Sequence, residues 1–530
     1  MTAYRILITD ELSPQALERL ETAAEVTFDV VRRPSREKLC EIIPDYDAII
    51  IRSSVRIDAD LLPLSSRLKV IGRAGMGLDN VDIDAASLRG VIVMNTPGAN
   101  TIATTEHAIA MLLALCRHIP QADASLRAGE WARSRFIGVQ LYRKTLGIVG
   151  LGRIGAQVAR RTQAFGMTVI AFDPYISDDV ARELNVTLVD MDELLARSDF
   201  ITLHTALTPE TRGMINARAI ARMKQGVRLV NCARGGLLDE AALVAALRSG
   251  HIAGAALDVF ADEPLPADSP LRSLPNVILT PHIAASTVEA QRDVGTQIVD
   301  QVLAALRGED FRNAVNMPVV DAGVFQLLKP YLQLAEKLGS LQMQLSEGRI
   351  KRVEVEFQGE EVADHVKPLT VALLKGLLDP ITDTPVNYIS APHLAMQRGI
   401  SVSETRGLPT PNYANLLSCR VLWDQGERLV SGSLLGHEFP RVVQIDDFRI
   451  DAQPEGIVLV MESIDMPGVI GQVGTLLGAH GINIAEWRLG RIAAGGQALS
   501  FINLDTPAPA NVLAELVQLQ GVNRVRQVTL

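Results

Sequence analysis

The sequence predicts an α/β protein with two parallel sheets, followed by a mixed α+β segment and a small βαββαβ domain. Over residues 5–94, and again over residues 145–279, short apolar runs of strand type alternate with helical patterns, which is typical of parallel α/β units. From residue 457 onward the runs follow the order βαββαβ, which indicates a ferredoxin-like fold. At 530 residues the chain is also too long for one hydrophobic core, so about three or four domains are expected.

Both series of strands consist of apolar runs, as expected for strands that are buried in parallel sheets. The strands expected in the first series are residues 5–8, 48–51, 68–71 and 91–94. Those expected in the second series are residues 145–149, 168–172, 200–203, 228–230, 254–257 and 276–279.

Two helical patterns connect the two series. One spans residues 102–117, and Thr101 and Thr104 are its expected N-terminal caps. The other begins at Ser286 and Glu289, which have the spacing of a capping box, and runs to about residue 305. Because this second helix would carry the chain back to the first sheet, we expect the first domain to be discontinuous, with the second domain inserted into it.

The expected domain limits follow from these patterns. Past residue 316 the pattern changes to mixed helices and strands, and no catalytic motif is recognisable before residue 452. The expected domains are residues 1–98 with 286–316, residues 99–285, residues 317–452 and residues 453–530.

The composition excludes several classes of function. A net charge of −10 disfavours a nucleic-acid partner, since phosphate binding normally requires a basic face. No apolar stretch approaches the roughly 20 residues that cross a bilayer, and the N-terminus has no secretory pattern, so a cytoplasmic protein is expected. Cys40, Cys116, Cys232 and Cys419 are widely scattered, which argues for reduced thiols and against a zinc site.

A glycine motif indicates a dinucleotide site. Gly150, Gly152 and Gly155 have the Gly-x-Gly-x-x-Gly spacing between an apolar strand and a helix, so backbone N–H groups would face a pyrophosphate. The next strand ends at Asp173, near the position expected of the acidic residue that binds a ribose diol. Since a carboxylate there repels a 2′-phosphate, NAD is favoured over NADP. The alternative is that Asp173 is an ordinary turn aspartate before Pro174.

Three residues in strand-end loops suggest acid–base chemistry. His282 suits the removal of a hydroxyl proton while hydride leaves the carbon. Glu263 would orient the imidazole and stabilise its protonated form. Arg234, which two glycines follow, would hold a substrate carboxylate through two parallel hydrogen bonds. Singly they could be a core histidine, a solvated carboxylate and a surface ion-pair partner; together they favour an NAD-dependent dehydrogenase of a small 2-hydroxy acid.

Several segments resemble the D-isomer-specific 2-hydroxyacid dehydrogenases, and most closely the phosphoglycerate dehydrogenases of that family. The segments are residues 73–80, 150–155, 231–236, 258–260 with 263–264, and 281–282 with 285–287. The likeness covers roughly residues 4–316. It implies a Rossmann-like nucleotide domain inserted in a flavodoxin-like substrate domain.

The resemblance further implies a reaction and its residues. Arg234, Glu263 and His282 would be catalytic, in the NAD-dependent oxidation of 3-phospho-D-glycerate to 3-phosphooxypyruvate in L-serine biosynthesis. The implied cofactor-binding residues are Gly150, Gly152, Arg153, Ile154, Gly155, Asp173, Thr205, Cys232, Ala233, Arg234, Asp258, His282, Ile283, Ala284 and Ala285. The implied substrate-binding residues are Arg52, Ser53, Arg73, Gly75, Asn100 and Arg133.

A phosphorylated substrate requires positive charge about one substrate length from the site of its carboxylate. Arg52 and Arg73 are candidates, as are Arg133 and Arg135. By resemblance, Arg133 would reach into the cleft of a neighbouring subunit of a homotetramer. Arg133 and Arg135 could instead form a solvated basic stretch.

The C-terminal unit resembles an ACT domain, which implies an allosteric site for a small molecule. Asp465 could meet an amino group, and Asn483 could bind an amino acid such as L-serine across a paired interface. Ser463 stands where some relatives have an aromatic residue, and this difference argues against affinity for serine.

The segment from residue 317 to 452 resembles the extra intervening domain of the long form of phosphoglycerate dehydrogenases. Lys351, Arg352 and Arg441 could bind an anion there, although surface charge explains them as well.

Two other functions fit the same core. A non-enzymatic NAD sensor, like the corepressors of the C-terminal binding protein type, has the two-domain core but lacks the ACT unit. A hydroxypyruvate or glyoxylate reductase would explain the catalytic residues equally well, although such enzymes are typically shorter. Some members of the family also reduce 2-oxoglutarate.

Overall fold

The computed structural model divides by its contacts into two compact units. The described residues are 4–318, 322–359, 365–382, 386–407, 413–424, 426–436 and 438–530. The first unit comprises Met1–Glu11, Leu20–Asn95 and Ile298–Leu530, and the second unit comprises Leu12–Arg19 and Thr96–Gln297. The four domain limits expected from the sequence stay a prediction.

The second unit is built on a parallel sheet with the strand order β12-β11-β10-β9-β6-β7-β8. Its strands are β6 (Thr145–Val149), β7 (Thr168–Phe172), β8 (Thr187–Leu188), β9 (Phe200–Leu203), β10 (Val227–Asn231), β11 (Ile252–Leu257) and β12 (Val277–Leu279). The strands expected at β6, β7 and β9 are confirmed at both ends. Because successive side chains of a strand face opposite sides, Ile201 and Leu203 join one hydrophobic core and Phe200 joins the other.

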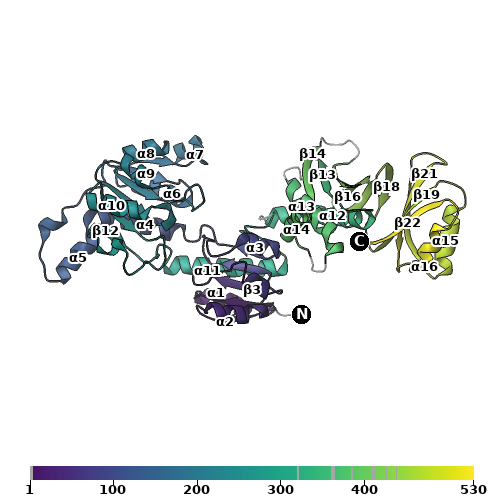
Figure 1. The fold of residues 1–530 in the computed structure, drawn as a ribbon, viewed down its shortest axis with the longest axis horizontal. Helices are drawn as coiled ribbons and strands as arrows, with labels where there is room; N and C mark the ends of the chain where they lie inside the picture. Colours follow the sequence, from purple (N-terminus) through teal and green to yellow (C-terminus); the bar gives the residue numbers. More distant parts are fainter. Residues whose placement is uncertain are drawn as a thin grey trace. The chain divides into compact units, whose positions relative to one another are not determined.

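Helices cover both faces of this sheet (Figure 1). They are α4 (Thr101–Arg117), α6 (Arg153–Gln163), α7 (Asp178–Glu183), α8 (Met191–Arg197), α9 (Ala217–Arg222) and α10 (Glu240–Ser249). Helix α5 (Ile119–Arg127) follows α4 in the chain. The expected caps of α4 are wrong. The helix already begins at Thr101, after Asn100, and Thr104 lies within its first turn. Asn100 itself makes no side-chain capping bond.

Helix α11 (Val288–Arg307) carries the chain back to the first sheet, as expected. Ile298 and Val302 pack so closely on Gly72 that a Cβ there would lie 2.6 Å from Val302. The expected cap of this helix is wrong by one residue, because the hydroxyl of Thr287, and not that of Ser286, accepts a hydrogen bond from the amide of Ala290 (3.1 Å).

The N-terminal part of the first unit is a parallel sheet with the order β2-β1-β3-β4-β5, which is the flavodoxin-like order. Its elements are β1 (Tyr4–Ile8), α1 (Pro14–Thr22), β2 (Val26–Val30), α2 (Arg36–Ile42), β3 (Ala48–Ile51), β4 (Val70–Arg73), α3 (Ile83–Leu88) and β5 (Ile92–Met94). Strand β2 is not predicted from the sequence, because it is an edge strand without a buried apolar run. Strand β4 begins two residues later than expected.

The segment that follows forms a mixed sheet with the order β14-β13-β15-β16-β17-β18. Its elements are α12 (Ala322–Leu345), β13 (Arg352–Gly359), α13 (Val366–Leu378), α14 (Ser390–Gln397), β14 (Ser401–Gly407), β15 (Asn415–Trp423), β16 (Gly426–Leu435), β17 (Phe439–Ile445) and β18 (Phe448–Ala452). Helices α12 and α13 pack together against the sheet through residues such as Leu338, Leu373 and Val355.

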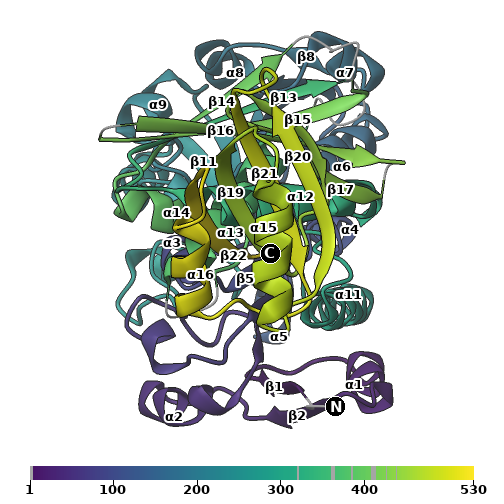
Figure 2. The same cartoon turned by 90° about the vertical axis from the view of Figure 1, so that its right-hand side faces the viewer.

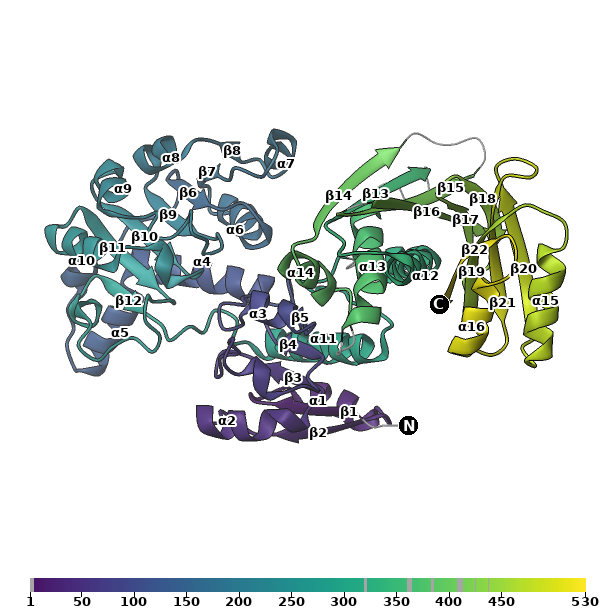
Figure 3. The same ribbon diagram turned by 45° about the vertical axis from the view of Figure 1, so that its right-hand side comes forward.

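The C-terminal part has the predicted order βαββαβ. Its elements are β19 (Ile457–Ile464), α15 (Val469–Ala479), β20 (Ile484–Arg491), β21 (Gln497–Leu504), α16 (Ala510–Val517) and β22 (Val522–Thr529). Helices α15 and α16 lie side by side over one face of its sheet (Figure 2). On the other face, Val458, Val460 and Phe501 belong to the same hydrophobic core as helix α12 (Figure 3). The last two segments therefore share one core.

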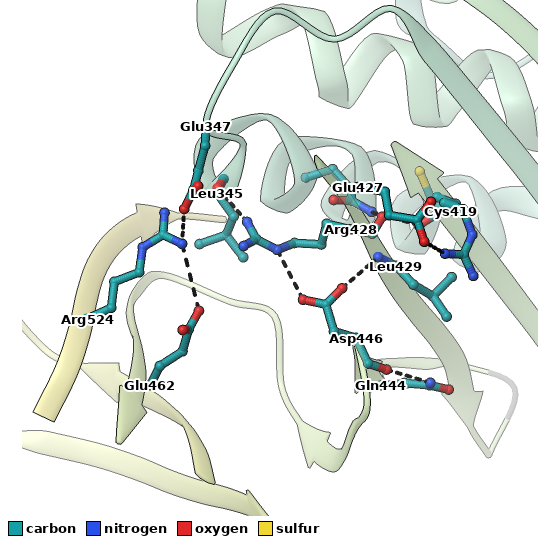
Figure 4. A network of polar contacts seen from close by, with 12 residues as sticks. Leu345, Glu347, Cys419, Glu427, Arg428, Leu429, Gln444, Asp446, Glu462 and Arg524 are labelled. Carbon is teal, nitrogen blue, oxygen red and sulfur yellow. Dashed lines mark hydrogen bonds and ion pairs between the residues drawn. The ribbon is translucent and has the colours of Figure 1, made fainter. Parts of the chain in front are cut away.

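Polar contacts cross the same junction (Figure 4). Arg524 of β22 forms ion pairs with Glu347, which follows α12, and with Glu462 of β19 (3.8 Å). Nearby, the nearly buried side chain of Arg428 lies 3.5 Å from Asp446. The pair of Arg524 with Glu347 joins the C-terminal sheet to the end of α12.

The cysteines are free, and all of them lie in the described part of the chain. None of the described helices combines the length and the apolar character needed to cross a membrane.

Candidate active site

The predicted site residues of the second unit gather at one edge of its sheet. All of its strands are parallel, so their carboxyl ends lie on the same side, where open α/β sheets bind ligands. Gly150 follows β6, Asp173 follows β7, Thr205 lies two residues after β9, Cys232 follows β10 and Asp258 follows β11.

The glycine motif forms a tight turn into helix α6. Gly150 has a φ of +93°, and a Cβ at Gly155 would lie only 2.1 Å from the carbonyl oxygen of Gly150. Gly152 is the N-cap of α6 and offers no side chain to the first amides of the helix. A phosphate group can therefore approach these amides closely, so the loop fits the pyrophosphate of a dinucleotide.

Asp173 lies beside this loop. One carboxylate oxygen accepts a hydrogen bond from the amide of Leu151 (2.8 Å), and the other accepts one from the amide of Tyr175 (2.9 Å). The bond to Tyr175 is that of a turn aspartate, whereas the bond to Leu151 ties the carboxylate to the glycine loop. The predicted contact of Asp173 with a ribose diol stays a prediction.

His282 and Glu263 form a hydrogen-bonded pair. Nδ1 of His282 lies 2.6 Å from Oε2 of Glu263, and the amide of Phe260 donates to the other oxygen of Glu263 (3.1 Å). Burial acts to raise the pKa of Glu263, but the bonds from His282 and Phe260 and the charge of Arg234 outweigh it, so this pKa lies below its ordinary value. The carboxylate is therefore charged at neutral pH and stabilises an imidazolium.

Arg234 lies on a neighbouring loop that packs against the loop of Glu263. A Cβ at Gly235 would lie 1.9 Å from the backbone of Phe260, so the two loops approach this closely only because residue 235 is glycine. The guanidinium of Arg234 donates to the carbonyl of Ala233 (2.7 Å). The three residues predicted to be catalytic thus lie on neighbouring loops of the second unit.

Asp258 is fully buried and binds the loop that carries His282. Its carboxylate accepts hydrogen bonds from the hydroxyl of Thr280 (2.6 Å) and from the amides of Ile283 and Ala284 (2.9 Å each). Its carbonyl accepts one from the amide of His282 (2.9 Å). The predicted contact of Asp258 with NAD stays a prediction, and the structure adds a role in fixing residues 282–284.

The other residues predicted to contact the cofactor lie along the same edge. Cys232 is nearly buried, and burial raises the pKa of its thiol, so the thiol is neutral. Ala284 is buried, whereas Ile283 is 40% exposed.

The predicted substrate residues are divided between the units. Arg52, Ser53, Arg73 and Gly75 belong to the first unit. Arg52 follows β3, and Arg73 is the last residue of the adjacent β4, so both lie at the carboxyl edge of that sheet. Asp10 accepts a hydrogen bond from the amide of Arg52 (2.8 Å), which anchors this loop.

Asn100 and Arg133 belong to the second unit. Among the described residues, the buried Oδ1 of Asn100 has no hydrogen-bond partner, so an acceptor is present at the start of α4. Arg133 is exposed. Arg135 forms an ion pair with Glu130 (2.6 Å), which favours a solvated surface role for Arg135.

In the C-terminal domain, both predicted ligand residues have partners within the chain. Asp465 follows β19, and its hydrogen bond from Arg491 (2.8 Å) holds the pKa of this carboxyl below its ordinary value. Asn483 precedes β20 and donates to Asp505 (2.7 Å). Ser463 is buried in β19.

The basic residues of the intervening segment also have acidic partners. The ion pairs are Lys351 with Asp424, Arg352 with Glu354 (3.2 Å), and Arg441 with Asp451 (3.8 Å). These pairs favour surface charge over an anion site.

Sequence reasoning missed His107 and Thr280. Nε2 of His107, on helix α4, lies 3.4 Å from a carboxylate oxygen of Asp258 and 3.3 Å from the hydroxyl of Thr280. The only signal in the sequence is a histidine within an apolar helix, and this does not tell which strand end the histidine faces.

Three family models match the chain. Residues 109–284 match the NAD-binding domain of D-isomer-specific 2-hydroxyacid dehydrogenases, residues 327–446 match the D-3-phosphoglycerate dehydrogenase intervening domain, and residues 457–521 match the ACT domain. The chain thus has an NAD-binding domain, an intervening domain and a C-terminal ACT domain, in that order.

Two similar relatives span nearly the whole chain. The D-3-phosphoglycerate dehydrogenase of Synechocystis is 43% identical over 98% of this chain and 94% of its own length. That of Methanocaldococcus jannaschii is 43% identical over 99% of this chain and 100% of its own length. Among solved structures, the D-lactate dehydrogenase of Aquifex aeolicus, complexed with NAD and lactic acid, is 31% identical, with a TM-score of 0.53 over 57% of this chain and 96% of its own. The chain therefore belongs to the D-3-phosphoglycerate dehydrogenase family of NAD-dependent D-isomer-specific 2-hydroxyacid dehydrogenases.

Proposed function

We propose that the chain oxidises 3-phospho-D-glycerate to 3-phosphooxypyruvate with NAD, the entry step of L-serine biosynthesis. The observation that carries this proposal is the 2.6 Å hydrogen bond between His282 and Glu263 at the carboxyl edge of a dinucleotide-binding sheet. The full-length similarity to D-3-phosphoglycerate dehydrogenases supports the choice of substrate.

His282 is the general base of the oxidation. Because Nδ1 is bonded to Glu263, Nε2 is the atom that takes the proton of the C2 hydroxyl, and the Glu263 carboxylate stabilises the imidazolium that results. Bound NAD would supply the hydride acceptor, and the loss of a hydride from C2 together with the hydroxyl proton leaves the C2 carbonyl. In the reverse direction the imidazolium of His282 returns the proton to the C2 oxygen.

Arg234 holds the substrate. A guanidinium binds a carboxylate through two parallel N–H donors, and the same group can polarise the neighbouring C2 oxygen. Gly235 supports this role, since the close packing that it allows keeps Arg234 beside the loop of Glu263.

The cofactor would be held along the strand edge. The amides of the loop from Gly150 to Gly155 suit the pyrophosphate, and Asp173 suits the ribose diol. The further residues that would contact it are Arg153, Ile154, Thr205, Cys232, Ala233, Arg234, Asp258, His282, Ile283, Ala284 and Ala285.

The phosphate of the substrate would be bound by Arg52 and Arg73. Ser53, Gly75 and Asn100 are further residues that would contact the substrate. Arg133 would serve the cleft of a neighbouring subunit, which requires an oligomer, and we propose a homotetramer in the cytoplasm.

The ACT domain supports an allosteric ligand, and we propose L-serine, the end product of the pathway. Asp465 would meet its amino group and Asn483 would bind it across a paired interface. Both side chains would then exchange their present partners, Arg491 and Asp505, for the ligand.

Assays of NADH absorbance with a panel of acids test the proposal. We expect oxidation of 3-phosphoglycerate to exceed that of glycerate and lactate, because the unphosphorylated acids lack the phosphate that Arg52 and Arg73 would bind. Reduction of 2-oxoglutarate is a second activity to test. A preference for hydroxypyruvate or glyoxylate would favour the reductase alternative, and NAD binding without turnover of any 2-hydroxy or 2-oxo acid would favour a corepressor-like sensor.

A further inference from the structure

We propose that His107 is a positioning residue that, through the buried carboxylate of Asp258, fixes the loop carrying His282. This inference deepens the proposed function and rests on it for the role of His282. The loop comprises residues 282–284, and His107 lies outside it on helix α4.

Asp258 is the centre of the arrangement. It is fully buried, and its carboxylate and carbonyl oxygens accept hydrogen bonds from the three consecutive amides of His282, Ile283 and Ala284 (2.9 Å each). His282 has a φ of +53°, a left-handed conformation that non-glycine residues rarely adopt. Since such a conformation persists only where the surroundings enforce it, these bonds hold the imidazole in its position.

His107 supplies a further donor to the buried carboxylate. Its Nε2 lies 3.4 Å from Oδ1 of Asp258 and 3.3 Å from the hydroxyl of Thr280, and its side chain is only 19% exposed. The hydroxyl of Thr280 already donates its proton to Asp258 (2.6 Å). A carboxylate can only accept, so Nε2 of His107 carries a proton and donates it.

The side chains around the Asp258 carboxylate come from three elements. Helix α4 contributes His107, the end of β12 contributes Thr280, and the end of β10 contributes the thiol of Cys232, which burial keeps neutral by raising its pKa. In the described part of the chain, His107 is the one basic side chain that contacts this carboxylate. Each donor that a buried carboxylate loses makes its charged form more costly, so the loss of His107 favours the protonated form of Asp258.

The arrangement has a consequence for pH dependence. Burial acts to raise the pKa of Asp258, but hydrogen bonds from His107, Thr280 and the loop amides outweigh it and hold this pKa below its ordinary value. Without the bond from His107 the pKa rises, so Asp258 takes up a proton at a higher pH and its hold on the loop amides weakens. Activity is then lost at a higher pH on the acid side.

Three variants test the inference. His107→Leu removes the donor, His107→Gln replaces it with an amide donor, and Glu106→Gln is the matched control at an exposed neighbouring position of the same helix. Each is assayed for kcat, for KM of NAD and of 3-phosphoglycerate, for activity against pH, and for deuterium exchange of the peptide that contains residues 282–284. We expect His107→Leu to lower kcat/KM about tenfold, to move the acid limb to higher pH and to speed exchange, with His107→Gln restoring all three.

Each result either supports or overturns the inference. A His107→Leu enzyme with an unchanged acid limb and unchanged exchange overturns it, even where thermal stability falls. If this variant does not fold, Thr280→Val, which replaces the hydroxyl with a methyl group, is expected to shift the acid limb in the same direction, and the absence of a shift overturns the inference. Deuterium exchange is measured without turnover. It therefore still tests whether His107 fixes the loop of residues 282–284 if His282→Ala stays active and the proposed function fails.

Discussion

Nδ1 of His282 lies 2.6 Å from Oε2 of Glu263, which holds the imidazole in one orientation. The pair leads to three predictions, two about catalysis and one about stability.

Replacing the acid–base residue removes the proton acceptor. We expect His282→Ala to lower kcat about 100-fold to 10,000-fold, the contribution typical of general acid–base catalysis. Binding of NADH, followed by its fluorescence, is expected to stay near that of the unmodified enzyme. His251→Ala is the control, because His251 precedes β11 and so lies at the opposite edge of the same sheet. A His282→Ala enzyme with near-normal kcat would remove His282 from the mechanism.

Glu263→Gln keeps the shape of the pair and removes its charge. The carboxylate favours imidazolium, so its loss is expected to lower kcat and to shift the His282-dependent limb of the oxidation profile toward lower pH. Steady-state rates across the pH range measure both effects. Asp262→Asn, a neighbouring exposed change, should leave the profile in place. A profile that stays fixed in Glu263→Gln would show that Glu263 does not act on His282.

The same carboxyl group also links pH to stability. Its pKa is lower in the folded protein than in the unfolded chain, so the pair stabilises the fold fully above the ordinary glutamate pKa of about 4.3. That stabilisation is lost as the pH falls through the lower, folded value. Denaturant unfolding of the unmodified protein and of Glu263→Gln should therefore converge toward acid pH, and a constant difference would contradict this linkage.

Gly235→Ala is expected to separate two catalytic loops. The added Cβ would overlap the backbone of Phe260, which cannot move aside as a flexible side chain can. We expect a loss of about 1–3 kcal/mol in the free energy of unfolding, together with a lower kcat, since Arg234 moves away from Glu263. Gly474→Ala is the control, because a Cβ there meets nothing within 4 Å. Full activity in Gly235→Ala would mean that the loops need not touch.

Arg52→Ala should separate phosphate recognition from chemistry. Loss of a charge-assisted hydrogen bond is expected to raise the KM for 3-phosphoglycerate by about 10-fold to 100-fold, with a small effect on the KM for NAD. Arg89→Ala, an exposed arginine of the same domain, is the control. An equal rise in the KM for glycerate and for 3-phosphoglycerate would show that Arg52 does not bind the phosphate.

Asn483→Ala tests the regulatory site. It removes the amide that now bonds to Asp505 and is expected to abolish inhibition by L-serine while leaving kcat unchanged. Titration of the initial rate with serine measures this. Asn523→Ala, which removes an exposed amide bonded to Gln497 in the same domain, should keep the inhibition. Serine inhibition that persists in Asn483→Ala would place the effector elsewhere.

The buried strands could be predicted from the sequence because their side chains face apolar neighbours on both sides. Strand β6 is such an unbroken apolar run, and its bounds are confirmed. Strand β2 could not be predicted, since it lies at a sheet edge and reads as mixed polar and apolar residues. The helix starts were wrong by about one residue at Asn100 and Thr287, because several neighbouring residues can serve as caps and only the folded backbone selects one.

The strand-end rule also located His282 and Arg234, since carboxyl ends of parallel strands meet at one edge. His107 could not be found by this rule, because it lies within a helix and not at the end of a strand. Its contact with Asp258 joins positions that are far apart in the chain, and it depends on how α4 packs across the sheet.

Val458, Val460 and Phe501 share a hydrophobic core with helix α12, and this restricts where the chain can be truncated. A protein that stops after residue 452 would expose the apolar side chains of α12 that now pack on the C-terminal sheet. An exposed apolar surface of this kind promotes aggregation. Serine insensitivity in such a truncated product would then report damage to the neighbouring domain rather than the missing effector site. A truncation should therefore keep or remove the last two domains together.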